Sequence, residues 1–198
     1  MSLIKPLPEA VVSRFRSGMK RAVDRGLPEP TAMTLATVGV HGRPSARTVL
    51  LKGMDAQGFV FYTNLTSRKG RHIQNSPDVS LVWWWRENGE QVLVDGQAQA
   101  VSDQEADLYF ASRPRGSQIG AWASLQSQPL ADRQQFLDRI AHFERKFADG
   151  DVPRPEHWSG FRVRPRRIEF WYERKYRLHE RVCFELTSDG WSETLLYP

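Results

Sequence analysis

The chain has few of the residues that indicate a disulfide-linked, metal-binding or membrane-spanning protein. Cys183 is its one cysteine, so no disulfide can form within the chain. The five histidines lie far apart and lack the spacing of metal ligands, and we therefore expect no metal site. No run of about 18 apolar residues occurs, so no segment is expected to span a membrane. The single cysteine and the absence of a signal peptide together predict a cytoplasmic protein.

The charge of the chain is modestly positive. Lys and Arg number 28 against 23 Asp and Glu, which gives a formal net charge of +5 at pH 7. A basic balance favours anionic partners, which include nucleic acid, membrane surfaces and phosphorylated small molecules, and charge alone does not choose among them. The length of 198 residues, 40% of them hydrophobic, fits one globular domain. We therefore expect a single domain over residues 1–198, with residues 1–28 as a helical N-terminal extension.

The spacing of apolar residues predicts a helix near the start of the chain and strands after it. Apolar residues recur at three- and four-residue steps over 8–26, as on one face of a helix. Short runs with period two, rich in Val, Leu, Thr and aromatic residues, then predict five strands, at 32–38, 46–52, 59–63, 79–85 and 91–101. The dipeptides His41-Gly42 and Asn88-Gly89 separate pairs of these runs and are typical of hairpin turns.

Helices interrupt the strands at 67–75 and return after residue 101. Ser102 and Glu105 form a capping box at the start of a helix that runs towards residue 112. A second helix is expected over 130–148, with an apolar stripe of Leu137, Ile140, Phe143 and Phe147. Strand-like segments at 161–171, 178–186 and 191–196 end the chain. The pattern predicts a β-dominated α+β fold, an antiparallel sheet curled into a barrel with helices packed around it.

A first group of polar residues lies in RTVLLK (47–52), FYTN (61–64) and SRK (67–69). Arg47 and Lys52 are five residues apart and point to opposite faces of a strand, so their joint use needs a bend or a site at the strand end. Arg68 and Lys69 fall in the first turn of the expected helix, where cations are unfavourable unless an anion is present. The group is compatible with a phosphate site and equally with a solvated basic turn.

A second group contains Tyr109 and Arg113, four residues apart near a helix end, followed by Ser117. Their spacing places Tyr109 and Arg113 on one face, and with Ser117 they could bind a second phosphate through charge-assisted hydrogen bonds. The alternative is that Arg113 caps the helix C-terminus and Tyr109 belongs partly to the core. Spacing alone slightly favours that alternative.

A third group is RLHER (177–181), which follows EFW (169–171). In a strand with period two, Arg177, His179 and Arg181 share one face and Leu178 lies on the other. Such a basic face commonly points to water. A histidine between two arginines could instead serve an anionic ligand or a proton transfer.

In this order and spacing, the segments RTVLLK, FYTN, SRK, SRPRGSQIGAW, QS and EFW followed by RLHER resemble the pyridoxamine/pyridoxine 5'-phosphate oxidase family. The likeness extends over residues 29–198. The resemblance implies a split barrel that binds flavin mononucleotide (FMN) and works as a homodimer with its sites at the subunit interface. It also implies oxidation of pyridoxine or pyridoxamine 5'-phosphate by O2 to pyridoxal 5'-phosphate, with no role for nucleic acid or membranes.

The resemblance further assigns individual residues of this chain. The implied FMN contacts, some of them from the other subunit, are Arg47, Thr48, Val49, Leu50, Leu51, Lys52, Tyr62, Thr63, Arg68, Lys69, Gln91, Gln126, Ser127, Trp171 and Arg181. The implied substrate contacts are Lys52, Tyr109, Arg113 and Ser117 on the 5'-phosphate, with Arg177, Leu178 and His179 near the pyridine ring. Arg177 and His179 are the implied catalytic residues.

Two features depart from the family pattern. Residues 1–8 lack the Arg-Arg-x-Tyr stretch that helps to close the site in many members, which puts the lid in doubt. Glu90 precedes Gln91 where the family usually has arginine, so we expect an altered cofactor edge there.

Two other functions compete with this interpretation. The short N-terminus favours a sister FMN oxidase acting on another aromatic compound, such as a phenazine precursor. The presence of Tyr109, Arg113, Ser117, Arg177 and His179 argues against it, because a substrate without phosphate would not need them. A barrel that binds single-stranded nucleic acid by stacking is the more distant alternative. Trp83, Trp84 and Trp85 favour it, but consecutive strand residues alternate faces and make no single platform.

Overall fold

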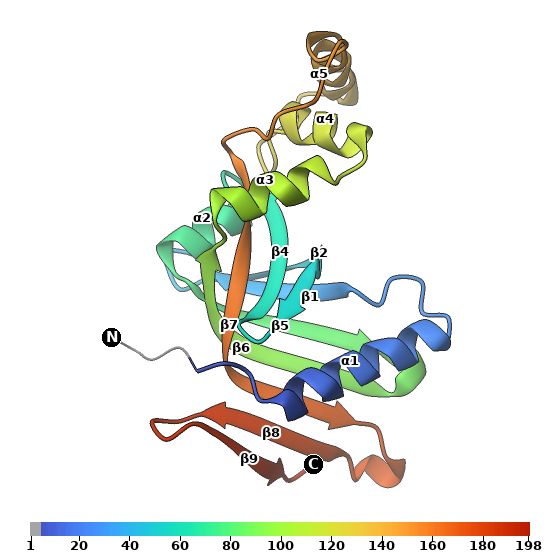
Figure 1. Ribbon diagram of the computed structural model, residues 1–198, viewed down its shortest axis with the longest axis vertical. Coiled ribbons are helices and arrows are strands. Elements are labelled where there is room, and N and C mark those ends of the chain that lie inside the picture. Colours follow the sequence, from blue (N-terminus) through green and yellow to red (C-terminus); the bar gives the residue numbers. More distant parts are fainter. Residues whose placement is uncertain (1–4) are drawn as a thin grey trace.

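The computed structural model describes residues 5–198 (Figure 1). Residues 1–4 lie outside this range. They are the first part of the predicted N-terminal extension and of the stretch that lacks the Arg-Arg-x-Tyr motif. The described chain forms one antiparallel sheet of nine strands with five α-helices around it. The strands are β1 (Ala32–Val38), β2 (Pro44–Leu50), β3 (Gly53–Asp55), β4 (Gly58–Asn64), β5 (Asp78–Trp85), β6 (Glu90–Ala100), β7 (Trp158–Tyr172), β8 (Glu180–Leu186) and β9 (Trp191–Leu196).

The sheet branches at its longest strand. Its main order is β2-β1-β5-β6-β7-β4-β3, and β8 joins β7 and carries β9. The first part of β7 pairs with β4 and the last part pairs with β8, so two strands share one edge of β7. The sheet therefore curls into an open, split barrel, as the sequence predicts (Figure 1).

The helices cover the sheet at two places (Figure 1). They are α1 (Glu9–Asp24), α2 (Arg68–Asn75), α3 (Asp103–Ala111), α4 (Arg115–Ala123) and α5 (Arg133–Lys146). Helix α1 lies along the sheet, while α3, α4 and α5 gather beyond one end of β4 and β7. Helices α3 and α4 of this second group form one side of the cavity described below.

The core packs α1 against the inner face of the barrel. Phe15 of α1 makes edge contacts with the rings of Phe59 and Trp83, at centroid distances of 5.1 and 5.0 Å. Gly18, one turn later, has no room for a side chain, since a Cβ there would lie 2.5 Å from the Trp85 ring. The hydrophobic residues of the predicted N-terminal extension therefore contribute directly to the barrel core.

The capping box predicted at residue 102 is half realised. The Ser102 hydroxyl accepts a hydrogen bond from the Glu105 backbone N–H at 3.1 Å, as expected of an N-cap. The Glu105 carboxylate does not complete the box, and instead accepts a hydrogen bond from Arg162 of β7 at 3.1 Å. An ion pair between helix and sheet thus replaces the second capping bond.

Two elements were missed, and the last helix begins later than predicted. Strand β3 was missed because three residues give no periodic signal. Helix α4 was missed because Gly116 and Gly120 lower its helix propensity and its apolar stripe is short. The last helix begins at Arg133, where Asp132 caps it, and Leu137 of its predicted stripe is 42% exposed.

Candidate functional site

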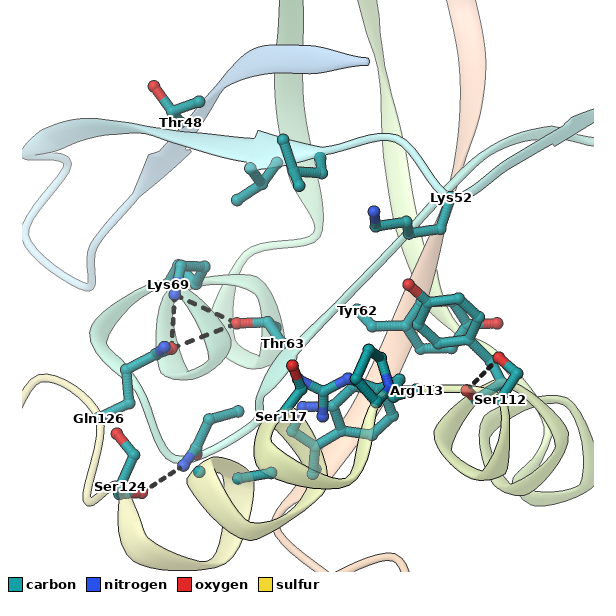
Figure 2. A pocket seen from close by; sticks show the side chains of 18 residues that line it. Thr48, Lys52, Tyr62, Thr63, Lys69, Ser112, Arg113, Ser117, Ser124 and Gln126 are labelled. Carbon is teal, nitrogen blue, oxygen red and sulfur yellow. Dashed lines mark hydrogen bonds between the residues drawn. The ribbon is translucent and has the colours of Figure 1, made fainter. Parts of the chain in front are cut away.

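A cavity of about 690 Å³ opens between the barrel and the group α3, α4 and α5, within the size range of about 300–1,000 Å³ typical of ligand sites (Figure 2). Its walls come from the ends of β2 and β4, the first turn of α2, the helices α3 and α4, and the start of β7. Segments distant in sequence thus meet at one end of the sheet. None of the lining residues is acidic, so the cavity suits an anionic ligand.

Lys69 of α2 is the cation at one side of this cavity (Figure 2). Its Nζ donates hydrogen bonds to Gln126 Oε1 at 2.7 Å and to Thr63 Oγ1 at 3.1 Å. Burial, and then the charge of Arg47, lower the pKa of Lys69 to about 8. Because only neutral oxygens surround the ammonium group, an anion would be a better partner than any this chain provides.

The start of α2 adds positive potential next to Lys69. Ser67 is the N-cap, and its hydroxyl accepts a hydrogen bond from the Gly70 N–H at 3.2 Å. The first turn contains no acidic residue and two cations, Arg68 and Lys69. Cations at a helix N-terminus are unfavourable because the helix dipole is positive there. An anion would be stabilised by the two cations and by the dipole. Lys69 together with this helix end suits a phosphate group, and we name the two together the α2 anion centre.

Arg47 does not line the cavity, but its charge acts on Lys69 of this centre. Its guanidinium donates to the Leu35 carbonyl at 3.0 Å, to Thr37 Oγ1 at 2.8 Å and to Ser45 Oγ at 2.8 Å. Burial and the neighbouring Arg68 lower the pKa of Arg47. Arg47 therefore contributes charge at a distance, while Lys52, just beyond the end of β2, reaches the cavity wall. Lys52 lies outside the strand, so alternation does not fix its direction; the cavity lies at the strand end, one of the two conditions that the spacing set for joint use of Arg47 and Lys52.

The opposite side of the cavity is aromatic. The rings of Tyr62 and Tyr109 stack at a centroid distance of 3.9 Å, and Trp158 lies nearly parallel to Tyr62 at 5.3 Å. Gly160 allows this arrangement, because a Cβ at that position would lie 2.6 Å from the Tyr62 ring. Burial raises the pKa of Tyr62 to about 12, so its hydroxyl stays protonated and can donate a hydrogen bond at neutral pH.

Arg113 is the second cation centre, between the aromatic layer and Ser117 (Figure 2). Its guanidinium carbon lies 4.7 Å from the centre of the Trp158 ring. Its Nη1 is buried and has no hydrogen-bond partner within residues 5–198, and burial lowers the pKa of Arg113. Arg113 as a whole is partly exposed and lines the cavity, so its charge can attract an anion there.

Most of the residues expected in the cavity are there. The predicted residues that line it are Thr48, Val49, Leu50, Lys52, Tyr62, Thr63, Lys69, Tyr109, Arg113, Ser117 and Gln126. Among the others, Leu51 is 7% exposed and belongs to the core, and Arg68 is exposed at the start of α2. Ser127 lines a neighbouring pocket instead and has a positive φ of 71°.

The cavity also contains residues that sequence reasoning missed. They are Asn64, Ser112, Pro114, Gly120, Ala121, Ser124 and Trp158. Asn64 and Ser112 fall within the quoted motifs FYTN and SRPRGSQIGAW, so their motif membership was a usable signal. Trp158 stands apart from every motif, and only the pairing of β7 with β4 places it beside Tyr62.

The remaining predicted residues form a separate group at the far ends of β6, β7 and β8. Gln91 pairs in register with Trp171, and Trp171 pairs with Arg181. The His179 ring lies 4.4 Å from the Trp171 ring. We name Gln91, Trp171, His179 and Arg181 the strand-end cluster; none of them lines the cavity of the same chain.

The prediction that Arg177, Leu178 and His179 belong to a strand is wrong. Strand β8 begins at Glu180, and Arg177 ends a short 3₁₀ turn after β7. Tyr176 and Arg177 both have positive φ, at 59° and 61°, a conformation that is costly for side chains other than glycine. Arg177 and Leu178 are exposed on this loop, so period two could not assign their faces.

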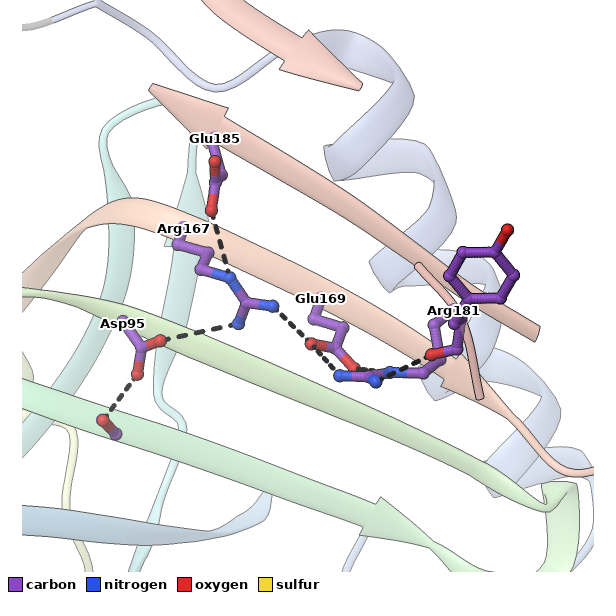
Figure 3. Close-up of polar contacts among 7 residues, drawn as sticks. Asp95, Arg167, Glu169, Arg181 and Glu185 are labelled. Carbon is purple, nitrogen blue, oxygen red and sulfur yellow. Dashed lines mark hydrogen bonds and ion pairs between the residues drawn. The ribbon is translucent and has the colours of Figure 1, made fainter. Parts of the chain in front are cut away.

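Arg181 is fixed by a charged network on the sheet (Figure 3). Glu169, 5% exposed, accepts hydrogen bonds from Arg181 Nε at 2.7 Å and Nη2 at 3.1 Å. Arg167 bonds to the same carboxylate, and these bonds oppose burial and lower the pKa of Glu169. The remaining Arg181 nitrogen donates to the Tyr197 carbonyl at 3.0 Å. Arg181 is therefore held rigidly, with all three of its nitrogens in hydrogen bonds.

The expectation that Glu90 alters the edge near Gln91 is not supported by its orientation. Glu90 is 9% exposed, and its carboxylate accepts hydrogen bonds from Arg21 Nε and Nη2, both at 3.0 Å. Neighbouring residues of a strand point to opposite faces, so Glu90 faces α1 while Gln91 faces away from it. Glu90 thus attaches α1 to the barrel.

Two absences concern residues 5–198. No group of three or more His, Cys, Asp or Glu side chains is arranged to hold a metal ion in this part of the chain. No helix there is long and apolar enough to cross a membrane.

Comparison with known proteins identifies relatives over nearly the whole chain. Residues 19–147 match the family described as pyridoxamine 5'-phosphate oxidase. Residues 158–198 match the pyridoxine 5'-phosphate oxidase C-terminal dimerisation region. The chain is 53% identical over 192 residues to the pyridoxine/pyridoxamine 5'-phosphate oxidase of Myxococcus xanthus, covering 97% of this chain and 93% of that protein. It is 56% identical to the enzyme of the same name from Xanthomonas euvesicatoria, covering 94% and 96% of the two chains.

A solved structure gives the corresponding result in three dimensions. PhzG from Burkholderia lata, in complex with tetrahydrophenazine-1-carboxylic acid, superimposes with a TM-score of 0.91. The two sequences are 31% identical, and the match covers 96% of this chain and 94% of PhzG.

Proposed function

Because this chain belongs to the pyridoxamine/pyridoxine 5'-phosphate oxidase family, we propose that it uses FMN to oxidise pyridoxine 5'-phosphate or pyridoxamine 5'-phosphate to pyridoxal 5'-phosphate. Oxygen is the electron acceptor and is released as hydrogen peroxide; the amine substrate consumes one water and also releases ammonia. The observation that carries the proposal is a cavity with no acidic lining residue and two separate cationic centres, the α2 anion centre and Arg113. A flavin nucleotide and a phosphorylated substrate would each bring one phosphate.

The α2 anion centre would hold the FMN phosphate. Lys69, Thr63 and Gln126 already share hydrogen bonds there, and α2 points its N-terminus at the same place. Arg47 and Arg68 add charge without a neutralising carboxylate in contact. The backbone and side chains of Thr48, Val49 and Leu50 would line the adjacent wall.

Arg113 would bind the substrate's 5'-phosphate, together with Lys52, Tyr109 and Ser117. These four side chains line the cavity and offer two charges and two hydroxyl donors. The partly exposed Arg113 supports the assignment, because it lines the cavity and offers positive charge to a phosphate. Binding energy from these contacts would orient the substrate for reaction rather than only retain it.

FMN, when bound, would accept a hydride from the C4' carbon of the substrate and pass the electrons on to O2. The chain itself would supply orientation and electrostatics. Arg177 and His179 are the proposed residues over the pyridine ring; His179 is held at the neighbouring strand end, where its Nδ1 accepts a hydrogen bond from the Arg174 N–H at 3.3 Å. The strained φ of Arg177 fits a residue whose conformation is set by function.

The active unit would be a homodimer. The strand-end cluster holds four of the proposed cofactor or substrate residues yet lies outside the cavity of its own chain. A second copy that placed its strand-end cluster over the cavity would complete the site. The match of residues 158–198 to a dimerisation region supports this arrangement.

Identification of the cofactor and an oxygen-consumption assay test the proposal together. Acid release from the purified protein should yield FMN, and both phosphorylated vitamin forms should drive oxygen uptake with one hydrogen peroxide per product. Recovery of FAD, or absence of oxygen uptake with both substrates on the flavin-loaded protein, would refute it.

PhzG supports a second candidate, a sister oxidase that acts on a phenazine precursor. The observation in its favour is the TM-score of 0.91 to a structure that holds such a compound. The 31% identity is well below the 53% and 56% to the vitamin enzymes. Oxidation of tetrahydrophenazine-1-carboxylic acid in preference to pyridoxine 5'-phosphate would favour this candidate.

A further inference from the structure

Trp158 occupies a central place in the aromatic layer of the cavity. It is the first residue of β7 and is 6% exposed. Its ring is nearly parallel to Tyr62 and makes an edge contact with Phe110 at 5.1 Å. Trp158 therefore touches side chains from both β4 and α3, the two elements that carry the tyrosines of the layer.

Arg113 depends on this ring for its position. In the described part of the chain, its side chain contacts the faces of Trp158 and Phe110, at 4.7 and 5.6 Å, and Nη1 has no hydrogen-bond partner. A long side chain loses considerable rotamer freedom when it is held in one place. The cation–π contact with Trp158, the shorter of the two, offsets that loss.

A network of hydrogen bonds fixes the backbone that carries this ring. The Trp158 carbonyl accepts a hydrogen bond from Arg154 Nη1 at 2.9 Å. The same guanidinium pairs with Asp103 at 2.8 Å and Asp107 at 2.6 Å, both on α3. Arg154 therefore connects the strand that carries the Trp158 ring to the helix that precedes Arg113.

We propose that Trp158 is a positioning residue for recognition of the substrate's phosphate. Its indole face holds the Arg113 guanidinium at the cavity wall before substrate arrives. This inference rests on the proposed function, since it requires Arg113 to bind the 5'-phosphate. It adds a residue outside all the motifs that carry the family resemblance.

The test compares the catalytic efficiencies for pyridoxine 5'-phosphate and pyridoxine, expressed as a ratio that we call phosphate discrimination. Trp158→Leu removes the aromatic face and should lower the discrimination by about threefold to thirtyfold, the range of a partly desolvated cation–π contact. The change should lie mainly in KM for the phosphorylated substrate, because the contact is present before reaction begins. Trp158→Phe keeps a smaller aromatic face and should restore part of the discrimination.

A double-mutant cycle separates positioning from packing. If Trp158 acts through Arg113, Trp158→Leu should have little further effect on discrimination in an Arg113→Ala background. Val152→Ala is the matched control, since Val152 belongs to the same hydrophobic cluster and does not line the cavity. It should lower thermal stability while leaving discrimination at the wild-type value.

The outcomes separate a failure of the proposed function from a failure of the positioning role of Trp158. Unchanged discrimination in Arg113→Ala would refute the phosphate role of Arg113 and with it the proposed function. Reduced discrimination in Arg113→Ala, with wild-type discrimination in a folded, flavin-loaded Trp158→Leu, would overturn the positioning role alone. An undiminished effect of Trp158→Leu in the Arg113→Ala background would overturn it as well. If Trp158→Leu does not fold, Trp158→Phe decides, and wild-type discrimination in that variant would reject the proposal.

Discussion

Lys69 illustrates at the residue scale how surroundings set the chemistry of a side chain. Its three hydrogen-bond acceptors are neutral, and burial lowers its pKa to about 8. The charged form is therefore disfavoured in the free protein and would be favoured by a bound phosphate. Binding of FMN should take up a proton at Lys69 when the pH lies near or above that pKa.

We accordingly predict that FMN affinity falls as the pH rises through about 8. Loss of the Lys69 charge removes a charge-assisted bond of roughly 1.5–3 kcal/mol, or about tenfold to a hundredfold in affinity. Titration of the apoprotein with FMN at several pH values measures this. Lys69→Gln should bind weakly without the pH step, and Arg68→Ala should bind weakly but retain it. An identical step in Lys69→Gln would assign the titration to another group.

Gly160 supports the aromatic layer by having no side chain. Gly160→Ala would place a Cβ 2.6 Å from the Tyr62 ring and 3.0 Å from the Phe61 carbonyl, so we expect a loss of stability of about 1–3 kcal/mol. Gly116→Ala is the control, because nothing lies within 4 Å of its Cβ position and alanine favours a helix. Chemical denaturation should show Gly160→Ala destabilised and Gly116→Ala not. Equal stability of the two variants would mean that the Tyr62 ring moves aside at little cost in free energy.

At the scale of elements, α1 is attached by a partly buried ion pair as well as by its apolar stripe. Arg21 of α1 binds the Glu90 carboxylate through two hydrogen bonds, and this pairing raises the pKa of Arg21. Glu90 also lies beside Gly18, where helix and strand approach closely. The pair therefore orients α1 against the start of β6, directly before Gln91.

We predict that Arg21→Met destabilises the fold by about 1–3 kcal/mol, since it leaves the Glu90 carboxylate largely buried and unpaired. Lys20→Met is the matched control on the same helix, because the Lys20–Asp24 pair is exposed and worth at most about 0.5 kcal/mol. Urea titrations of both variants supply the comparison. Equal effects would show that the buried pair contributes no more than the exposed one.

Elements with strong periodicity could be predicted from the sequence, and irregular segments could not. Strand β1 was predicted with its observed bounds, because its alternation is unbroken. The loop before β8 was not predicted. Arg177 and His179 alternate in the sequence like residues of a strand, but the positive φ values of Tyr176 and Arg177 take the backbone out of the extended conformation. The fully buried Trp83 and the 48% exposed Trp84 confirm the alternation that argued against a stacking platform.

At the scale of the whole molecule, the predicted site residues divide into two groups that one chain does not bring together. Motif order placed Lys69, Tyr109 and Arg113 correctly in one cavity. Trp158 could not be found, because its approach to Tyr62 depends on long-range strand pairing. Sequence also could not tell which residues join the strand-end cluster rather than the cavity, since that depends on the branching of β7.

A two-subunit site predicts complementation between defective chains. Lys69→Ala and Arg181→Ala homodimers should each bind FMN weakly. Heterodimers of the two should contain one native site, so random mixing should restore about a quarter of all sites if the interface is a twofold one. FMN retention after mixing, dissociation and reassociation measures the recovery. No recovery in verified heterodimers would place Lys69 and Arg181 in the same subunit's site or in none.

The central claim is a flavin oxidase that requires the phosphate of its substrate, and one comparison tests it most directly. Oxygen consumption by the wild-type protein gives the catalytic efficiencies for pyridoxine 5'-phosphate and for pyridoxine. Without the phosphate, the donors of Lys52, Tyr109, Arg113 and Ser117 stay unpaired in the cavity. We predict a loss in efficiency of at least about a thousandfold, part of it in turnover. Comparable efficiencies for the two compounds would contradict the account.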